Sequence, residues 1–254
     1  MLQLERYQKI KDYLIRNEYA DIKKLAEMLN VSTATIRRAL KQLESEKVVA
    51  LTRGGATLAK KGTLYEFPYR VKQEMYNEEK RRISQAAMQY VHKNESIFLD
   101  SSSTVFEMTR FLAKFENITI TTNDIYIAQH LVNAENIEVT VIGGSIRRHY
   151  YTLTGYFADT ILKDLSFDCA FLGIDALSLR GGLMITNIEE VQIKRKVIDR
   201  SNKIIVLCDH SKFDQDSFLN VCYYPDIDMI ITGRELDKNI YNKYIEEGVN
   251  LILV

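Results

Sequence analysis

Residues 31–58 read VSTATIRRALKQLESEKVVALTRGGATL, and this stretch decides the fold of the N-terminal part of the chain. Ser32 is placed to cap a helix that ends near Lys47, and the helix carries apolar residues at helical spacing. Two short apolar runs, residues 48–51 and 56–58, follow it, and the glycines between them allow a tight reversal. The stretch therefore predicts a helix followed by a β-hairpin.

The residues upstream complete a three-helix arrangement. Residues 4–16 carry apolar side chains at helical spacing, and Asp21 is placed as the N-cap of a second helix over residues 22–29. Three short helices followed by a β-hairpin are typical of a winged helix-turn-helix, whose third helix lies in the DNA major groove. A generic three-helix bundle is the alternative, but it does not require the adjacent Arg37 and Arg38 or a glycine-tipped basic hairpin.

The polar face of the third helix and the tip of the hairpin hold the candidate DNA contacts. Hydroxyl and basic side chains in the first turns of such a helix reach base edges and phosphates, and the hairpin lies as a wing beside the backbone or the minor groove. The candidate DNA-binding residues are Ser32, Thr33, Thr35, Arg37, Arg38, Lys41, Arg53, Gly54 and Gly55. Double-stranded operator DNA is the partner expected for this part of the chain.

The chain has 254 residues and a formal net charge of +0, but the charge is unevenly distributed. Residues 1–62 contain 13 Lys and Arg against 7 Asp and Glu, a charge of +6, and the remainder carries −6. A basic module joined to an acidic one favours contact between the first part and a polyanion, with chance variation of surface charge as the alternative. Apolar residues make up 46% of the chain and charged residues 27%, proportions that exclude a mainly disordered protein.

The length of the chain favours two domains, and the periodic pattern breaks between them. We expect a winged helix-turn-helix domain over residues 1–58, a linker over 59–76 that includes Lys60 and Lys61, and a second, larger domain over 77–254. No apolar run approaches the roughly 18 residues that a membrane span needs, and the first residues do not resemble a signal peptide. We therefore expect a cytoplasmic protein without a membrane partner.

The second domain alternates apolar, strand-like runs with helical ones. The expected strands are 96–100, 118–122, 138–142, 169–173, 203–209, 229–232 and 251–254, and the expected helices are 77–92, a segment ending at Ala113, a segment ending at Val132, 157–165, 188–200 and 237–247. Continuous apolar strands separated by helices predict an α/β fold with a doubly wound, largely parallel sheet. In such sheets ligands bind beyond the carboxyl ends of the strands.

Small polar residues follow the predicted strands at those ends. The run Asp100-Ser101-Ser102-Ser103-Thr104 comes directly after a strand and opens a helix, so hydroxyl and N–H groups face one point at a positive helix terminus. A phosphate suits this point, and ordinary N-capping by serine is the alternative. Further strand ends supply Thr121-Thr122-Asn123, Gly143-Gly144 with Arg147, Gly173-Ile174-Asp175 and Asp209-His210-Ser211-Lys212. Several ends of the same polar character favour the phosphate site.

Both parts of the chain resemble the DeoR family of bacterial transcriptional regulators. In the N-terminal part the resemblance rests on residues 31–40, which read VSTATIRRAL, and on Arg53-Gly54-Gly55-Ala56. In the C-terminal part it rests on motifs in the family's order, namely Phe98 to Thr104, Thr122-Asn123, Gly143-Gly144 with Arg147, Ala170 to Asp175, Gly182-Leu183, Glu190 with Lys194-Arg195, and Asp209 to Phe213. The chain departs from the family's usual pattern at Ala39, where aspartate is usual, and at Ser102, where glycine is frequent.

The resemblance implies a repressor of a sugar-metabolism operon, whose sensor domain is related in fold to sugar-phosphate isomerases and binds a phosphorylated sugar that alters operator binding. It implies that Ser101 to Thr104 hold the phosphate and that Asp100 and Asn123 contact hydroxyls or organise the loop. The full candidate ligand-binding set is Asp100, Ser101, Ser102, Ser103, Thr104, Thr122, Asn123, Gly143, Gly144, Arg147, Gly173, Asp175, Glu190, Lys194, Asp209 and Lys212. For Glu190 and Lys194, four positions apart on a helix, a weak surface pair is the alternative.

The cysteines and histidines give no sign of a metal site. Cys169, Cys208 and Cys222 lie in apolar runs without Cys-x-x-Cys spacing or a nearby pair of histidines. We expect buried, unreactive thiols and neither a disulfide framework nor structural zinc. No metal ligand and no cofactor are predicted.

Two functional questions stay open at this stage. A sugar-phosphate isomerase with a DNA-binding appendage is the alternative from another class, and Asp175, Glu190 and Asp209 are its available carboxylates. Activation of transcription uses the same domains as repression. One winged module buries little surface on DNA, so we expect a homodimer or homotetramer on repeated half-sites.

Overall fold

The computed structural model describes residues 2–17, 19–46, 48–59, 62–112 and 114–254. They form two compact units, Met1–Met75 and Tyr76–Val254. Four positions used above lie outside the described residues. They are the predicted helix ends at Lys47 and Ala113 and the linker residues Lys60 and Lys61.

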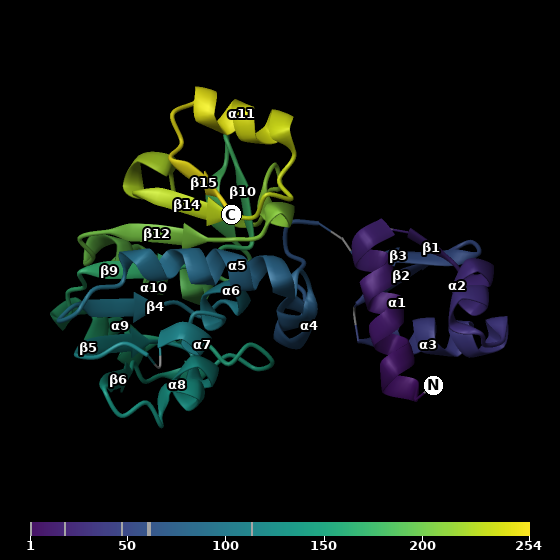
Figure 1. Ribbon diagram of the computed structural model, residues 1–254, viewed down its shortest axis with the longest axis horizontal. Coiled ribbons are helices and arrows are strands. Elements are labelled where there is room, and N and C mark those ends of the chain that lie inside the picture. Colours follow the sequence, from purple (N-terminus) through teal and green to yellow (C-terminus); the bar gives the residue numbers. More distant parts are fainter. Residues whose placement is uncertain (1, 18, 47, 60–61, 113) are drawn as a thin grey trace. The chain divides into compact units, whose positions relative to one another are not determined.

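Three helices and a three-stranded antiparallel sheet make up most of the N-terminal unit (Figure 1). The elements are α1 (Gln3–Asn17), β1 (Tyr19–Asp21), α2 (Ile22–Leu29), α3 (Thr33–Ser45), β2 (Val49–Thr52) and β3 (Gly55–Leu58), and the strand order is β1-β3-β2. The apolar residues at helical spacing, among them Ile10, Leu25, Ile36 and Leu40, are buried. The predicted winged helix-turn-helix is confirmed.

Local capping sets the helix boundaries of this unit. The Asp21 carboxylate accepts hydrogen bonds from the backbone N–H groups of Lys23 and Lys24, and the Ser32 hydroxyl accepts one from Thr35. Between α2 and α3, Asn30 adopts the left-handed conformation that ends a helix. Strand β1 was not predicted, because its three residues are too few to show an alternating pattern.

The segment over 59–76, predicted as a linker, contains a short helix. Residues Tyr69–Glu74 form α4, directly after Pro68, and belong to the N-terminal unit. Tyr69 and Val71 are buried, and Lys11 Nζ lies 3.0 Å from a Glu74 carboxylate oxygen. Six residues give too little periodicity to distinguish a helix from a loop.

A seven-stranded sheet, in which every neighbouring pair is parallel, forms the centre of the C-terminal unit. Its strands are β4 (Ser96–Leu99), β5 (Ile118–Thr122), β6 (Ile137–Val141), β9 (Cys169–Leu172), β12 (Ile204–Leu207), β14 (Met229–Thr232) and β15 (Leu251–Leu253). The order is β15-β14-β12-β9-β4-β5-β6. All seven strands were predicted, and the doubly wound α/β fold is confirmed.

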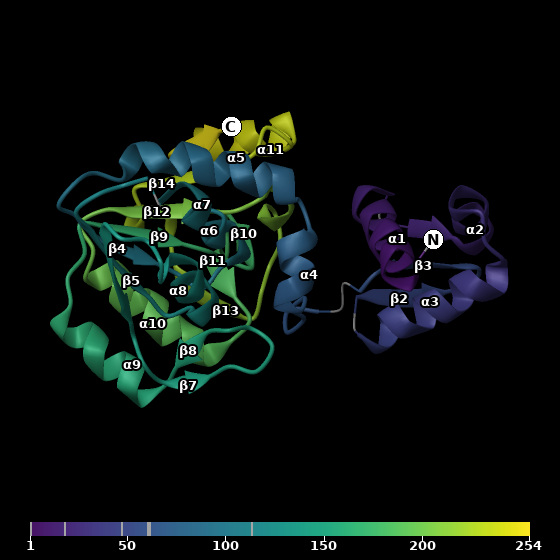
Figure 2. The same cartoon turned by 60° about the horizontal axis from the view of Figure 1, so that its bottom comes forward.

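Helices cover both faces of this sheet. They are α5 (Asn77–Ala87), α6 (Ser103–Phe106), α7 (Thr109–Leu112), α8 (Ile125–Leu131), α9 (Tyr156–Ile161), α10 (Ile188–Asp199) and α11 (Lys238–Glu246), with short 3₁₀ turns at Met88–Tyr90, Leu162–Asp164, His210–Lys212 and Tyr224–Asp226. Ile97 and Leu99 of β4 pack in the cluster that contains the buried side chains of α5 and α8, whereas Phe98 packs with those of α9 and α10. Figure 2 shows α5 on one side of the sheet and α9 and α10 on the other.

Several short elements of this unit were not predicted. They are a two-stranded sheet of β7 (Ser145–Ile146) and β8 (Leu153–Thr154), and an antiparallel sheet of β10 (Ala176–Ser178), β11 (Gly182–Ile185) and β13 (Leu219–Cys222). The helix expected to run to Ala113 is instead two four-residue helices, α6 and α7. Parallel strands of similar length were predicted because each alternates with a helical segment, whereas these short strands do not follow that alternation.

The strand order defines a topological switch point. From β4 the chain adds β5 and β6 on one side, and it then returns to add β9, β12, β14 and β15 on the other. The connections that leave β4 and β9 therefore diverge at the carboxyl ends of these two neighbouring strands. Ligands of open α/β sheets bind at this position.

None of the helices in the described part of the chain combines the length and apolar character required to span a membrane.

Candidate functional site

A buried ion pair lies at the switch point between β4 and β9. The Asp100 carboxylate, directly after β4, accepts hydrogen bonds from Lys194 Nζ of α10 and from the Gly173 N–H, the latter at 2.8 Å. Lys194 is only 3% exposed and also donates to the Gly173 carbonyl at 2.9 Å. Lys194 therefore joins the carboxyl ends of both strands, and the alternative of a surface pair between Lys194 and Glu190 is wrong.

The serine run after Asp100 is partly accessible. Ser101 and Ser102 are half-buried, whereas Ser103 and Thr104 are buried. The Ser101 N–H donates to Asn123 Oδ1 at 3.0 Å, which fixes the start of the loop to the end of β5. The Ser102 hydroxyl accepts from the Thr104 and Val105 N–H groups, so this serine caps α6. Capping thus accounts for Ser102, but it does not account for the hydroxyls of Ser101 and Ser103.

Ser102 fits its place because Gly173 has no side chain. A Cβ atom at position 173 would lie 2.2 Å from the Ser102 Cβ and 2.3 Å from its hydroxyl oxygen. The backbone of Ser102 is extended, with φ of −155°, a conformation open to any residue. The serine that replaces the family's frequent glycine is therefore accommodated by a glycine on the neighbouring strand end.

Lys80 of α5 is a site residue that the sequence analysis missed. Its side chain is 3% exposed, and Nζ lies 3.1 Å from the Ser103 hydroxyl and 3.9 Å from Asp209 Oδ2. A signal for Lys80 was present, because it precedes the buried Ile83 and Ala87 by three and seven positions and so lies on the apolar face of the helix. A lysine on such a face must find a polar partner, and it finds two at the strand ends.

The positive charge at this edge comes mainly from lysines. Helix α6 has four residues, too few for the strong terminal dipole that the sequence analysis invoked. Lys80, Lys194 and Lys212 instead converge on the strand ends that carry Asp100 and Asp209. Burial alone would raise the pKa of Asp209, but the charges of Lys212 and Lys80 outweigh it and hold the pKa below its usual value. Asp209 is therefore ionised, and its Oδ1 accepts from the Ser211 N–H at 3.1 Å.

Asp124 and Thr152 extend the site and were also missed. The Ser101 hydroxyl donates to Asp124 Oδ2 at 2.7 Å and lies 2.7 Å from the Thr152 hydroxyl oxygen. Asp124 is fully buried and caps α8 through the Tyr126 and Ile127 N–H groups. Burial raises its pKa to about 6. The position of Asp124 directly after the Thr122-Asn123 motif was the available signal.

Some predicted ligand residues are occupied by other partners. Arg147 Nη1 lies 2.7 Å from Glu190 Oε1, and its guanidinium stacks over the Tyr150 ring. The Asp175 carboxylate accepts from the N–H and the hydroxyl of Thr186. These pairs hold Arg147, Glu190 and Asp175 in place.

Thr122 and Gly144 have structural roles. The Thr122 hydroxyl is buried, donates to the Leu99 carbonyl at 2.7 Å and accepts from the Asp124 N–H at 3.0 Å, so it does not face a ligand. Gly144 has φ of +148°, and a Cβ there would lie 2.4 Å from the Thr154 carbonyl oxygen. Gly144 therefore permits the close approach of β7 to β8. Gly143 is half-buried, and a Cβ there would meet no atom within 4 Å, so packing does not require a glycine at this position.

Most of the DNA-binding candidates are exposed on the N-terminal unit. Arg37, Arg38 and Lys41 of α3 and Arg53 of the hairpin are exposed, and within the described part of the chain none of them has an ion-pair partner. The hydroxyls of Ser32 and Thr35 lie 2.9 Å apart, so these two residues cap the helix as well as facing outward. Thr33 is half-buried.

The tip of the hairpin differs from expectation at one glycine. Gly54 is exposed, with φ of +89°, as a tight turn requires. Gly55 is buried instead, because it pairs with Asp21 of β1, and a Cβ there would lie 2.3 Å from the Ala20 carbonyl oxygen. Gly55 therefore lets β1 approach the hairpin and does not project towards DNA.

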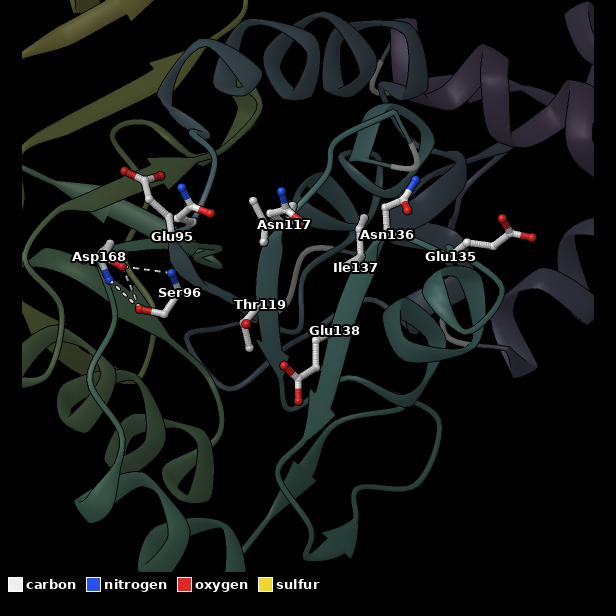
Figure 3. A pocket seen from close by; sticks show the side chains of 11 residues that line it. Glu95, Ser96, Asn117, Thr119, Glu135, Asn136, Ile137, Glu138 and Asp168 are labelled. Carbon is white, nitrogen blue, oxygen red and sulfur yellow. Dashed lines mark hydrogen bonds between the residues drawn. The ribbon is translucent and has the colours of Figure 1, made fainter.

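An open hollow of about 760 Å³ lies at the opposite edge of the sheet, at the amino ends of β4, β5 and β6 (Figure 3). Its described lining includes Glu95, Glu135, Glu138 and Asp168 and no lysine or arginine. Hydrogen bonds from the Ser96 N–H and hydroxyl lower the pKa of Asp168, so its carboxylate is ionised. This acidic hollow repels a phosphate, and the candidate site is the carboxyl edge.

The cysteines are buried, as predicted. Burial raises the pKa values of Cys169 and Cys222 to about 12 and that of Cys208 well above its usual value, so the thiols stay protonated. Within the described ranges, no group of three or more histidine, cysteine and acidic side chains is placed to hold a metal ion.

Two family models match the chain. The model described as the DeoR-like helix-turn-helix domain matches residues 6–62, and the model described as the DeoR C terminal sensor domain matches residues 75–234. The second match alone covers more than half of the chain.

Individual relatives cover nearly its whole length. The HTH-type transcriptional regulator GolR of Listeria innocua is 31% identical over 250 residues, which cover 98% of each chain. The HTH-type transcriptional repressor GlcR of Bacillus subtilis is 30% identical over 255 residues, covering 100% of this chain and 97% of that one. Among solved structures, ribose 5-phosphate isomerase A from Neisseria gonorrhoeae aligns with a TM-score of 0.39 and 17% identity, over 56% of this chain and 54% of its own.

Proposed function

Because the chain belongs to the DeoR family of transcriptional regulators, we propose that it represses a sugar-metabolism operon under the control of a phosphorylated sugar. The observation that carries the proposal is the carboxyl edge of the sensor sheet, where buried lysines and serine hydroxyls meet at the switch point. The exposed arginines of α3 supply the second anion-binding surface, which is shaped for a duplex. One chain thus has a receptor for DNA and another for a small anion.

In this proposal the phosphate contacts the serine run. Ser101, Ser102 and Ser103 provide hydroxyl and N–H groups, and Lys80 and Lys212 provide positive charge. Lys194, held between Asp100 and Gly173, fixes the two strand ends, and Asn123 fixes the loop. Support comes from the 3.1 Å contact between Lys80 and the Ser103 hydroxyl and from the partial accessibility of Ser101 and Ser102. Charged donors such as lysine make the strongest hydrogen bonds to phosphate oxygens.

For DNA, we propose that α3 lies in the major groove. Arg37, Arg38 and Lys41 contact base edges and phosphates, and Arg53 and Gly54 contact the backbone beside them. Support comes from the exposure of these side chains and the confirmed helix-turn-helix. Ser32 and Thr35 contribute less, because their hydroxyls are engaged with each other and with the helix end.

We propose that the sensor unit binds its sugar phosphate without converting it. An isomerase needs an acid and a base placed on one substrate. Each of the three carboxylates available for this role is already engaged by the protein: Asp175 accepts from Thr186, Glu190 pairs with Arg147, and Asp209 lies beside Ser211 and Lys80. Turnover of a pentose or hexose phosphate by the purified protein would contradict this part of the proposal.

We propose that the chain acts in the cytoplasm as a homodimer or homotetramer. A single recognition helix contacts too few base pairs for a specific site, whereas two copies read repeated half-sites. The mass of the purified protein in solution tests this number of copies.

The first experiment measures DNA binding. Fluorescence anisotropy with a duplex from upstream of the protein's own gene, at about 100 mM salt, is expected to show specific binding that weakens steeply as salt increases. Addition of glucose 6-phosphate, fructose 6-phosphate, ribose 5-phosphate or other sugar phosphates is expected to change the affinity for at least one member of the panel. A protein that does not bind this DNA more tightly than unrelated DNA, with or without the sugar phosphates, contradicts the proposal.

A second experiment locates the ligand site with a matched pair of variants. Lys203 and Lys212 flank β12 at its amino and carboxyl ends. Lys212→Gln is expected to weaken sugar-phosphate binding at least about tenfold, a loss of roughly 1.4 kcal/mol, measured by the ligand-dependent shift in thermal unfolding. Lys203→Gln removes the same charge at the opposite end of β12 and is expected to leave binding unchanged. Equal effects of the two variants would place the ligand elsewhere.

A further inference from the structure

The first turns of α5 are tied to the carboxyl ends of two strands. Glu79, only 3% exposed, accepts a hydrogen bond from the His210 N–H at 2.8 Å, and its second oxygen lies 2.7 Å from His210 Nδ1. Glu79 also packs on Gly233 after β14, where a Cβ would come within 2.4 Å of the glutamate. Arg82, one turn later, pairs with Glu235 at 2.6 Å. The start of α5 is therefore fixed to the segments that follow β12 and β14.

The next residue of the same helix reaches the proposed phosphate site. Lys80 Nζ contacts the Ser103 hydroxyl and lies 3.9 Å from Asp209, the residue before His210. Ser84 donates to the Thr104 carbonyl at 2.7 Å, so α5 is also bonded to the start of α6. Consecutive residues of one helix, Glu79 and Lys80, thus hold consecutive residues of one strand end, His210 and Asp209.

This helix begins at the junction between the two units of the chain. Tyr76 is the first residue of the C-terminal unit, and Met75 is the last of the N-terminal one. Tyr76 adopts the left-handed conformation, with φ of +54°, which residues other than glycine, asparagine and aspartate rarely adopt. Its ring packs edge-on against the His210 ring, with the centroids 4.7 Å apart. A continuous set of contacts therefore runs from Ser103 through Lys80, Glu79 and His210 to Tyr76.

We propose that Glu79 and His210 are positioning residues that couple ligand occupancy at the serine run to the backbone at Tyr76. The inference rests on the proposed function. A phosphate at the serine run competes with Asp209 for Lys80, because both are anions within reach of one cation. A change at Asp209 moves His210, to which Glu79 and the Tyr76 ring are bound. The chain enters the DNA-binding unit directly from Tyr76, so the ligand acts on DNA through this junction.

The test compares the response to ligand with each affinity measured alone. In the full-length protein, His210→Phe keeps a ring against Tyr76 but removes the nitrogen that meets Glu79, and His210→Asn restores a polar atom near that position. Wild type is expected to change its DNA affinity by about 5- to 150-fold when the most stabilising sugar phosphate of the panel is added, which is the usual range of allosteric coupling. His210→Phe is expected to keep each separate affinity within about threefold of wild type and to lose most of this coupling. His210→Asn is expected to retain it.

A matched control and a second variant make the outcome decisive. His92 is exposed beyond the other end of α5, so His92→Phe should respond to the sugar phosphate as wild type does. Tyr76→Asn removes the ring while keeping a residue type that tolerates the left-handed conformation, and it is expected to lose coupling even if His210→Phe folds poorly.

Full coupling in both His210→Phe and Tyr76→Asn overturns the inference but leaves the proposed function intact. Absence of any response in wild type overturns the proposed function, and the inference with it. Loss of sugar-phosphate affinity in parallel with coupling overturns the positioning role.

Discussion

Asp124 shows how a single buried residue sets a pH dependence. Burial raises its pKa from an ordinary value of 3.8 to about 6 in the folded protein, so the folded state holds the proton more tightly than the unfolded chain. The stability gained in this way is complete below the unfolded pKa and is lost as pH rises through the folded one. Between about pH 5 and pH 7.5, wild type is expected to lose about 1 kcal/mol of unfolding free energy from this group.

Asp124→Asn tests this expectation, because asparagine caps α8 with the same geometry and does not titrate. Denaturant unfolding at a series of pH values is expected to show a flatter profile for the variant than for wild type across this window. A parallel decline of both proteins would assign the pH dependence to other groups. His210 must be kept unchanged in this comparison, because its hydrogen bond to Glu79 raises its own pKa.

Gly173 and Ser102 give a second expectation at the scale of single residues. Gly173→Ala is expected to lower the unfolding free energy by about 1–3 kcal/mol, because its methyl group would overlap the Ser102 side chain. Ser102→Gly in the same protein removes the overlap, since the nearest remaining Ser102 atom is the Cα at 3.6 Å. Thermal unfolding of the two single variants and the double variant measures the coupling, and simple additivity would contradict it.

Sequence reasoning at this scale found residue types but not their partners. The motifs that contain Asp100 and Lys194 were identified, but the ion pair between them was not. These residues are 94 positions apart, and they meet only because the fold brings α10 to the ends of β4 and β9. Glu190 was weighed against its helix neighbour Lys194, whereas it pairs with Arg147 from another segment. Lys80 was missed because a lysine beside two glutamates is typical of a solvated surface. Its position on the apolar face of the helix was the stronger signal.

Helix α3 is the element that carries the expected DNA contacts. Arg37→Ala and Arg38→Ala are each expected to weaken operator binding by about 1–3 kcal/mol if the side chain meets a base, with loss of preference at that base pair. If the side chain meets a phosphate, the slope of log affinity against log salt is expected to fall by about 1. Salt titrations by anisotropy distinguish the two. Lys163→Ala removes an exposed charge from the sensor unit and should leave DNA binding unchanged.

Strands were predictable from sequence where short apolar runs alternate with helical segments. The inner strands β4, β9, β12 and β14 are mostly apolar and almost wholly buried, so they stand out without an alternating pattern. Strands β7, β8 and β10 have two or three residues, and helix α4 has six, so none shows a period. They form because tertiary contacts hold them, and a single sequence does not contain those contacts explicitly.

The whole molecule is expected to function as more than one copy of the chain. Light scattering is expected to give a mass of two or four times 29.4 kDa. A monomeric mass together with tight, specific operator binding would contradict this expectation, because a single winged module contacts one half-site.

The separation of the chain into two units also predicts separable defects. Arg37→Ala is expected to bind the sugar phosphate as wild type does, measured by thermal shift. Lys212→Gln is expected to keep its affinity for DNA in the absence of ligand. If both variants lost both activities equally, the two anion sites would not be independent.

The contact between Gly173 and Ser102 has a consequence for how this site diverges over evolutionary time. A lineage with serine at position 102 cannot accept a larger residue at 173, whereas a lineage with glycine at 102 has room for alanine there. Substitution at 173 is thus open only after position 102 has become glycine, and the order of the two events is constrained. Among descendants of a common ancestor, the pair serine and alanine at these positions is expected to be rare.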